Sequence, residues 1–111
     1  MMWNKGNATF SNKKVEIEVI IEEYKPLCFG VIEANIESEC HLPSLRIDQY
    51  NLELDGLWAE GLEGRVAIYI NDEADYIRRA DLEPPSSPSI WVEFNPGTAK
   101  AWLLLLDIES G

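Results

Sequence analysis

The sequence predicts a single α+β domain with one clear helix and five to six strands, and three observations support this. Apolar residues at positions 17, 20, 21 and 24 have the spacing of one helical stripe. Several later segments alternate apolar and polar residues or are short apolar runs, as β-strands are. The chain has 111 residues, the length of one domain, and its 46% hydrophobic content is enough to form a modest core.

The first expected element is a helix over Lys13–Tyr24, with Ser11 or Asn12 as its N-cap. The apolar stripe should face the core, while the glutamates of the segment lie mostly off it and should be solvated. The helix should end near Tyr24, because Pro26 disfavours helical geometry at Lys25.

A short, continuously apolar strand is expected next, over Leu27–Ile32. Continuous apolar character is typical of a strand that is buried on both faces within a layered fold. Glu33 follows directly at the C-terminal end of this strand. This unit of helix, proline-marked turn, buried strand and carboxylate is the most informative part of the sequence.

The remainder of the chain is rich in expected strands. The segments with strand patterns are Tyr50–Leu54, Arg65–Ile70, Asp75–Ala80 (the weakest), Ser89–Phe94 and Lys100–Ile108. Loops are expected over Asp55–Gly64, which contains three glycines, and over Glu83–Pro88, which is rich in proline. Asn95–Gly97 is a tight turn signal, so the last two strands should form a hairpin.

The charge balance limits the function of the chain on its own. There are 20 acidic and 9 basic residues, for a net charge of −11, which argues against a nucleic-acid binder working through a basic patch. The longest apolar run, Ala101–Leu106, is too short to span a membrane, and the N-terminus lacks the apolar core of a signal peptide. We therefore expect an intracellular protein without membrane contact, in the nucleus or the cytoplasm.

Cysteine and histidine content supports neither a disulfide framework nor a zinc site. Cys28 and Cys40 are the only cysteines and are not closely spaced, and Cys28 lies in an apolar stretch where a small buried residue is expected. Together with His41, the single histidine, they do not supply the four ligands of a structural zinc site.

Five segments, in order, resemble one known family. Their sequences are Trp3-Asn4-Lys5-Gly6-Asn7, the helix over Lys13–Tyr24, Tyr24-Lys25-Pro26 followed by the apolar strand and Glu33-Ala34-Asn35, Gly64-Arg65-Val66-Ala67-Ile68-Tyr69-Ile70, and Ser89-Ile90-Trp91-Val92-Glu93-Phe94. This series is similar to the N-terminal part of the endonuclease/exonuclease/phosphatase superfamily, in the form found in the endonuclease domains of non-LTR retrotransposons.

The resemblance implies a fold, and it implies which part of that fold this chain would form. The family has a four-layer α/β/β/α sandwich, of which residues 1–111 would form the N-terminal portion. We therefore expect a partial domain, truncated at its C-terminus.

The resemblance also implies a site. Glu33 would be the carboxylate that ligates a divalent cation, Mg²⁺ or Mn²⁺, and Asn4 would help to orient the metal and the scissile phosphate. Both would then be catalytic residues of a metal-dependent phosphodiesterase that cleaves DNA in the intact domain. Asn7 and Asn35 are further candidates to face this site, although solvated loop positions suit both.

The chain departs from the family pattern in ways that bear on activity. It lacks the later Asp/Asn pair and the C-terminal Asp-His pair, and His41 is not at the position of the family's catalytic histidine. Ile32 precedes the glutamate where Gln, Ser or Thr is common, and Ile108 stands where relatives carry a tyrosine. We therefore expect the chain alone to be inactive and to bind DNA weakly or not at all, and no DNA-contacting residue is assigned.

Two other functions remain open. The chain could be a small acidic interaction module, derived from such a domain, whose exposed strand edges are covered by a protein partner or by a second copy. It could also belong to a small-molecule phosphatase of the same superfamily, although the segment around Pro26 favours the endonucleases.

Overall fold

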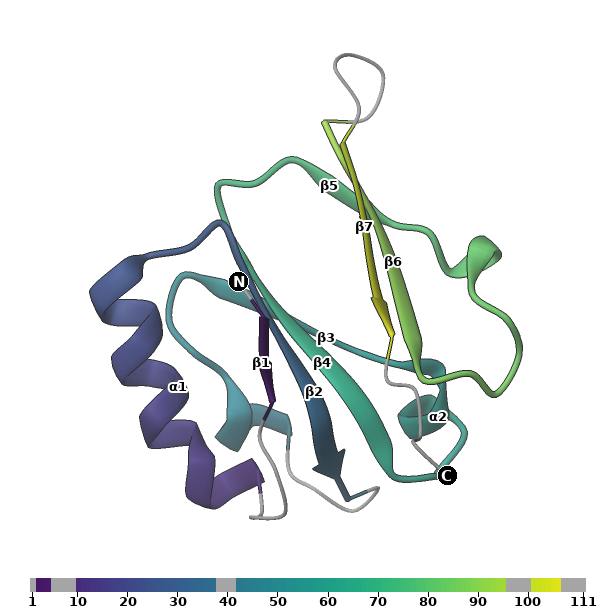
Figure 1. Ribbon diagram of the computed structural model, residues 1–111, viewed down its shortest axis with the longest axis horizontal. Helices are drawn as coiled ribbons and strands as arrows, with labels where there is room; N and C mark the ends of the chain where they lie inside the picture. Colours follow the sequence, from purple (N-terminus) through teal and green to yellow (C-terminus); the bar gives the residue numbers. More distant parts are fainter. Residues whose placement is uncertain (1, 5–9, 38–41, 96–100, 107–111) are drawn as a thin grey trace.

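A computed structural model describes residues 2–4, 10–37, 42–95 and 101–106, and describes residues 2–4, 10–12 and 101–106 by their backbone alone. Three layers lie side by side (Figure 1): a helix, a four-stranded sheet and a three-stranded sheet. The predicted α+β class is confirmed, and the layers follow the order α/β/β.

The four-stranded sheet has the order β1-β2-β4-β3. Its strands are β1 (Met2–Asn4), β2 (Cys28–Ile36), β3 (Tyr50–Leu54) and β4 (Gly64–Asn71). β1 is parallel to β2, whereas β4 is antiparallel to both of its neighbours. The buried centre of the sheet is β4, whose residues 66–70 are all fully buried.

The second sheet has the order β5-β6-β7 and is antiparallel throughout. Its strands are β5 (Tyr76–Arg78), β6 (Ser89–Phe94) and β7 (Ala101–Leu106). Ser89 pairs with Leu106 and Phe94 pairs with Ala101, which confirms the predicted hairpin, although its turn at residues 96–100 lies outside the described residues. The weak strand predicted over Asp75–Ala80 is present but spans only three residues.

The single long helix, α1 (Phe10–Tyr24), covers one face of the four-stranded sheet (Figure 1). Ser11 and Asn12 lie inside it, so the predicted N-cap is wrong by about one turn. The helix ends at Tyr24 as Pro26 predicts, and Lys25 then takes a left-handed φ of 47°.

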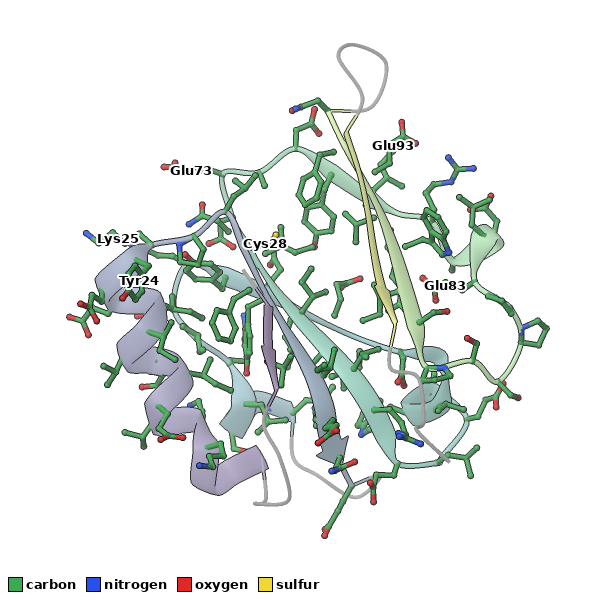
Figure 2. All side chains as sticks on the ribbon, viewed as in Figure 1. Tyr24, Lys25, Cys28, Glu73, Glu83 and Glu93 are labelled. Atoms are coloured by element: carbon green, nitrogen blue, oxygen red, sulfur yellow. The ribbon has the colours of Figure 1, made fainter. Side chains whose placement is uncertain are left out.

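The apolar stripe of α1 packs only in part as predicted. Ile17 and Ile21 are buried and Ile20 is half-buried, in a cluster with residues of β2, β3 and β4. Tyr24 is 62% exposed and points away from the sheet at the end of the helix (Figure 2), which corrects the prediction that it faces the core. The chain leaves the helix at Lys25, so the last position of the stripe lies beyond the covered part of the sheet.

A second apolar cluster joins the two sheets. Its buried members are Val66, Ile68, Ile70, Ile90, Val92 and Phe94. Cys28 packs against this cluster (Figure 2) but is only half-buried, so its prediction as a small buried residue holds in part. Side chains of β4 therefore alternate between the two cores, which explains why that strand is apolar on both faces.

Short helical turns occupy the connections. They are η1 (Leu42–Leu45), α2 (Gly56–Ala59) and η2 (Ala80–Leu82). The sequence predicted no helix at η1 or α2, and α2 corrects the prediction of a loop over residues 55–64. Cys40 and His41 precede η1 and lie outside the described residues.

Candidate functional site

The expected buried strand is longer than predicted, and the candidate metal ligand lies within it rather than after it. The pairing of β2 with β4 is regular up to Ile32, which lies opposite Val66, and resumes at Ile36 opposite Gly64. The intervening residues Glu33, Ala34 and Asn35 form a β-bulge, here called the β2 bulge.

The β2 bulge holds two residues in a backbone conformation that side chains disfavour. Glu33 has a φ of 53° and Asn35 a φ of 49°. Asparagine adopts left-handed conformations comparatively readily, but for glutamate the conformation costs about 1–2 kcal/mol. Such strain persists only where the surrounding structure enforces it, and it is concentrated at functional sites in proteins.

The bulge also keeps Glu33 out of the core. Before it, Phe29 and Val31 pack on the helix side, so a regular strand would place Glu33 on that same buried face. After it, Ala34 and Ile36 take over the helix side, so the alternation has shifted by one residue. Glu33 is half-buried instead, and its side chain makes no hydrogen bond or ion pair to another described residue.

Asn4 lies beside this position through the pairing of β1 with β2. The two strands are parallel, and Asn4 lies opposite Ile32, the residue before Glu33. Neighbouring strands are about 4.8 Å apart, so the backbones of Asn4 and Glu33 end up adjacent at one edge of the sheet. The side chain of Asn4 and the whole of Asn7 lie outside the described residues.

The donor set suits a hard divalent cation. Mg²⁺ prefers oxygen ligands, commonly takes only one or two carboxylates and retains several waters. A half-buried glutamate whose backbone lies beside that of an asparagine at the end of β1 is compatible with that requirement. Among the described residues, no group of three or more His, Cys, Asp or Glu side chains gathers, so a site with many carboxylates is not formed by them.

A second carboxylate near this end of the sheet has a structural role. Asp55 is 1% exposed, and its Oδ2 accepts hydrogen bonds from the backbone N–H groups of Arg65 (2.8 Å) and Val66 (3.1 Å). Its Oδ1 accepts a third from Trp58 at 3.3 Å, which makes Asp55 the N-cap of α2. Asp55 thereby fixes the start of β4 beside the β2 bulge.

A third polar cluster joins the two sheets and was not predicted from the sequence. The Nε and Nη2 groups of Arg78 bind both carboxylate oxygens of Glu83, at 3.0 and 2.9 Å. Nη1 of Arg78 also donates to the carbonyl of Leu54 and lies 3.8 Å from Glu53. Glu83 additionally accepts from the backbone N–H of Trp91. One guanidinium therefore interacts with two carboxylates, Glu53 of β3 and Glu83 after η2, which lie far apart in the sequence.

Burial raises the pKa of Glu53 above its usual value, against the opposing charge of Arg78, and Glu83 adds to the rise. Burial also raises the pKa of Tyr76, with the charge of Glu53 contributing. The positive charge of Arg78 therefore offsets only part of the effect of burial on the pKa of Glu53.

No protein-family model matches the chain, and no curated protein sequence matches it. Within the described residues, no helix is both long enough and apolar enough to cross a membrane.

Proposed function

We propose that Glu33 and Asn4 form one half of a divalent-cation site of the kind used by metal-dependent phosphodiesterases. The observation that carries the proposal is the β2 bulge. It holds a strained, half-buried glutamate within β2, one residue past the position that pairs with Asn4 at the end of β1.

The support is mainly geometric. The bulge diverts a carboxylate from the core at a cost in backbone strain, and such strain occurs preferentially at functional sites. The backbone of Asn4 lies on the adjoining strand, opposite the residue before Glu33, which makes Asn4 the candidate for a second oxygen ligand. Asp55 secures the facing end of β4 through backbone hydrogen bonds and so fixes the edge against which the bulge lies.

The chemistry follows from the donor set. Glu33 would hold Mg²⁺ or Mn²⁺ through its carboxylate, and Asn4 would orient a water or a phosphate oxygen beside it. A cation held there neutralises the charge of a phosphodiester and polarises its phosphoryl oxygen. Neither residue supplies a general base, so we propose that the described site binds metal without cleaving DNA.

The test is an NMR titration of the ¹⁵N-labelled chain with Mn²⁺, whose paramagnetism broadens signals near the bound ion. Broadening should be strongest at the amides of residues 3–4 and 32–35. It should reverse when excess Mg²⁺ competes for the site. Uniform broadening over the acidic surface would contradict the proposal.

The matched variants are Glu33→Gln and Glu73→Gln, which remove the same charge. Glu73 is exposed at the turn between β4 and β5, at the other end of the sheet (Figure 2). Glu33→Gln should abolish the local broadening, whereas Glu73→Gln should leave it unchanged. Equal effects of the two variants would show that the metal is attracted by the net charge of −11 and is not bound specifically at Glu33.

A further inference from the structure

The edge strand β3 carries unpaired backbone groups. Antiparallel pairing gives each residue of a strand either both or neither of its backbone groups toward the partner. The hydrogen bonds from Asp72 N–H to the Gln49 carbonyl and from Asp55 N–H to the Val66 carbonyl show that the odd-numbered residues face β4. Even-numbered residues 50, 52 and 54 therefore direct their backbone groups to the open side.

One backbone group at each end of that open edge is hydrogen-bonded to another described residue, but the groups between them are not. The N–H of Tyr50 donates to the carbonyl of Ile47, and the carbonyl of Leu54 accepts from Arg78. In the described part of the chain, no partner is recorded for the Tyr50 carbonyl, the Leu52 N–H and carbonyl, or the Leu54 N–H. These four groups are spaced as one added strand would need them.

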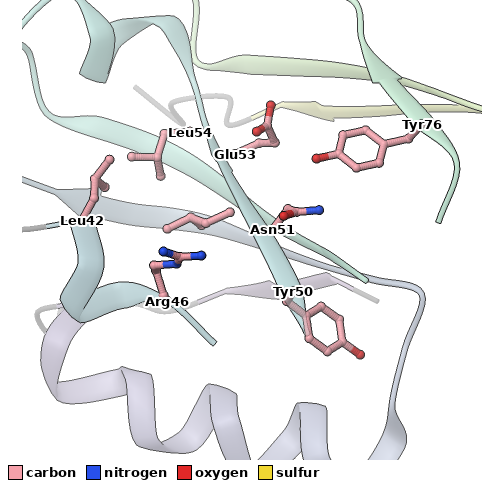
Figure 3. Close-up of a pocket in the computed structure, with 8 residues that line it drawn as sticks. Leu42, Arg46, Tyr50, Asn51, Glu53, Leu54 and Tyr76 are labelled. Atoms are coloured by element: carbon pink, nitrogen blue, oxygen red, sulfur yellow. The ribbon is translucent and has the colours of Figure 1, made fainter. Parts of the chain in front are cut away.

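The open edge lies in a groove of about 300 Å³ that has two different sides (Figure 3). On the helix side it is lined by Leu42 and Leu52, with Arg46 at the rim. On the side of the second sheet it is lined by Asn51, Glu53 and Tyr76, which are polar. An added strand would thus meet an apolar face and a polar face with alternate side chains.

The polar side of the groove is short of positive charge. Glu53 lies 3.8 Å from Arg78, whereas Arg78 makes closer, two-point contact with Glu83. On this side of the groove two carboxylates and one guanidinium leave one negative charge, while Arg46 lines the opposite, helix side; the chain as a whole carries −11. The side chain of Glu53 is 26% exposed, so an incoming cation can reach it.

We propose that β3 binds an extended segment of a basic protein partner, in which apolar residues alternate with Lys or Arg. The segment pairs with the open groups of Tyr50, Leu52 and Leu54. Its apolar side chains pack against Leu42 and Leu52, and one basic side chain pairs with Glu53.

A second copy of this chain fits the groove less well. Pairing of β3 with itself would bring another Glu53 to the polar side, with an Arg78 already bound by its own Glu83, between two molecules that each carry −11. Like charges across a pair of strands are destabilising. Nucleic acid is disfavoured for the same electrostatic reason.

The test uses a blocked peptide, acetyl-Val-Lys-Val-Lys-Val-Thr-amide, and its counterpart with Glu in place of both Lys residues. Titration into the ¹⁵N-labelled chain should shift the amides of residues 50–54 and slow the hydrogen exchange of Leu52 and Leu54. The Glu peptide should bind at least tenfold more weakly. Equal binding of the two peptides, or shifts confined to another surface, would overturn the proposal, as would dimerisation through β3 without peptide.

Two variants separate the backbone and charge contributions. Leu52→Pro removes an N–H that faces away from β4 and should abolish binding, whereas Leu52→Ala retains that N–H and should weaken binding only severalfold. If Leu52→Pro does not fold, Glu53→Lys provides the decisive comparison, because it should reverse the preference so that the Glu peptide binds better. An unchanged preference would refute the assigned role of Glu53. None of these residues contacts the β2 bulge, so this result is independent of the metal titration.

Discussion

Two acidic regions lie near the same end of the four-stranded sheet and are built in opposite ways. Asp55 is buried, and its two carboxylate oxygens accept hydrogen bonds from three backbone N–H groups. Glu33 is half-buried and lies on a strained bulge, and its side chain makes no hydrogen bond to another described residue. The first carboxylate is fully occupied by the fold, whereas the second has no such role among the described residues.

The difference separates a carboxylate that maintains the fold from one that we propose to be a cation ligand. A buried carboxylate needs hydrogen bonds to offset its lost hydration, and Asp55 has them. Glu33 instead lies where the backbone conformation costs energy, and the residue is only half-buried. The comparison predicts that Asp55 contributes mainly to stability and that Glu33 contributes mainly to binding.

The largest effect is expected from Asp55→Ala. Removal of the carboxylate leaves buried N–H groups at the start of β4 without an acceptor and deletes the N-cap of α2. We expect the free energy of unfolding to fall by about 3 kcal/mol, as measured by urea denaturation. The control Asp48→Ala, at an exposed turn residue, should change it by less than about 0.5 kcal/mol.

The next largest effect on stability is expected from Arg78→Met, and this effect should depend on pH. The change leaves Glu53 and Glu83 near each other without a cation, and we expect a loss of about 2 kcal/mol at pH 7. Arg78 opposes the rise that burial causes in the pKa of Glu53, so its removal raises that pKa further. A carboxyl with a raised folded pKa loses stability as pH rises through that pKa. Destabilisation should therefore be smaller near pH 4, and a loss independent of pH would contradict this account.

Glu33→Gly should stabilise the protein by up to about 1 kcal/mol. Glycine relieves the left-handed strain, worth about 1–2 kcal/mol, and its greater flexibility in the unfolded chain offsets part of the gain. The control Glu37→Gly, at a residue without positive φ, should destabilise by about 0.5–1 kcal/mol. The comparison fails if Glu33→Gly destabilises as much as the control, because Glu33 would then support the fold.

Glu53→Gln should have the smallest effect. Burial raises the pKa of Glu53, so the fold disfavours its charged form, and stability is lost as pH rises through the folded pKa. Glutamine is neutral at every pH. The variant should be more stable than the original chain at pH 7, by less than about 1 kcal/mol, and about equal to it below pH 4. A variant that is less stable at pH 7 would show that Arg78 outweighs burial.

Elements with local signals were predictable from the sequence. Ile17 and Ile21 mark the packed face of α1, and Pro26 marks its end, because helical spacing and proline geometry act over a few residues. The alternation within β3 and β6 identified those strands for the same reason. The assignment of Asn4 and Glu33 to one site came from the resemblance and stays a prediction; the structure adds that Asn4 pairs with Ile32, the residue before Glu33.

Features that depend on distant contacts were not predictable. Neither Glu33 nor Asn35 is a glycine, so nothing local revealed their left-handed conformation or the bulge. Asp55 resembled any loop aspartate until β4 brought two N–H groups to it from ten and eleven residues away. Arg78 was assigned to a weak strand, and its contact with Leu54 spans 24 residues. In each case the partner is supplied by the tertiary fold.

The most direct test of the central claim is a crystal structure of the chain soaked in Mn²⁺, with the ion located by its anomalous scattering. The account predicts a peak about 2.1 Å from a carboxylate oxygen of Glu33, near Asn4, and none at Asp55. The same soak of Glu33→Gln should lose that peak. A peak at Asp55 or at Glu53 and Glu83, with none at Glu33, would contradict the division between structural and ligand-binding carboxylates.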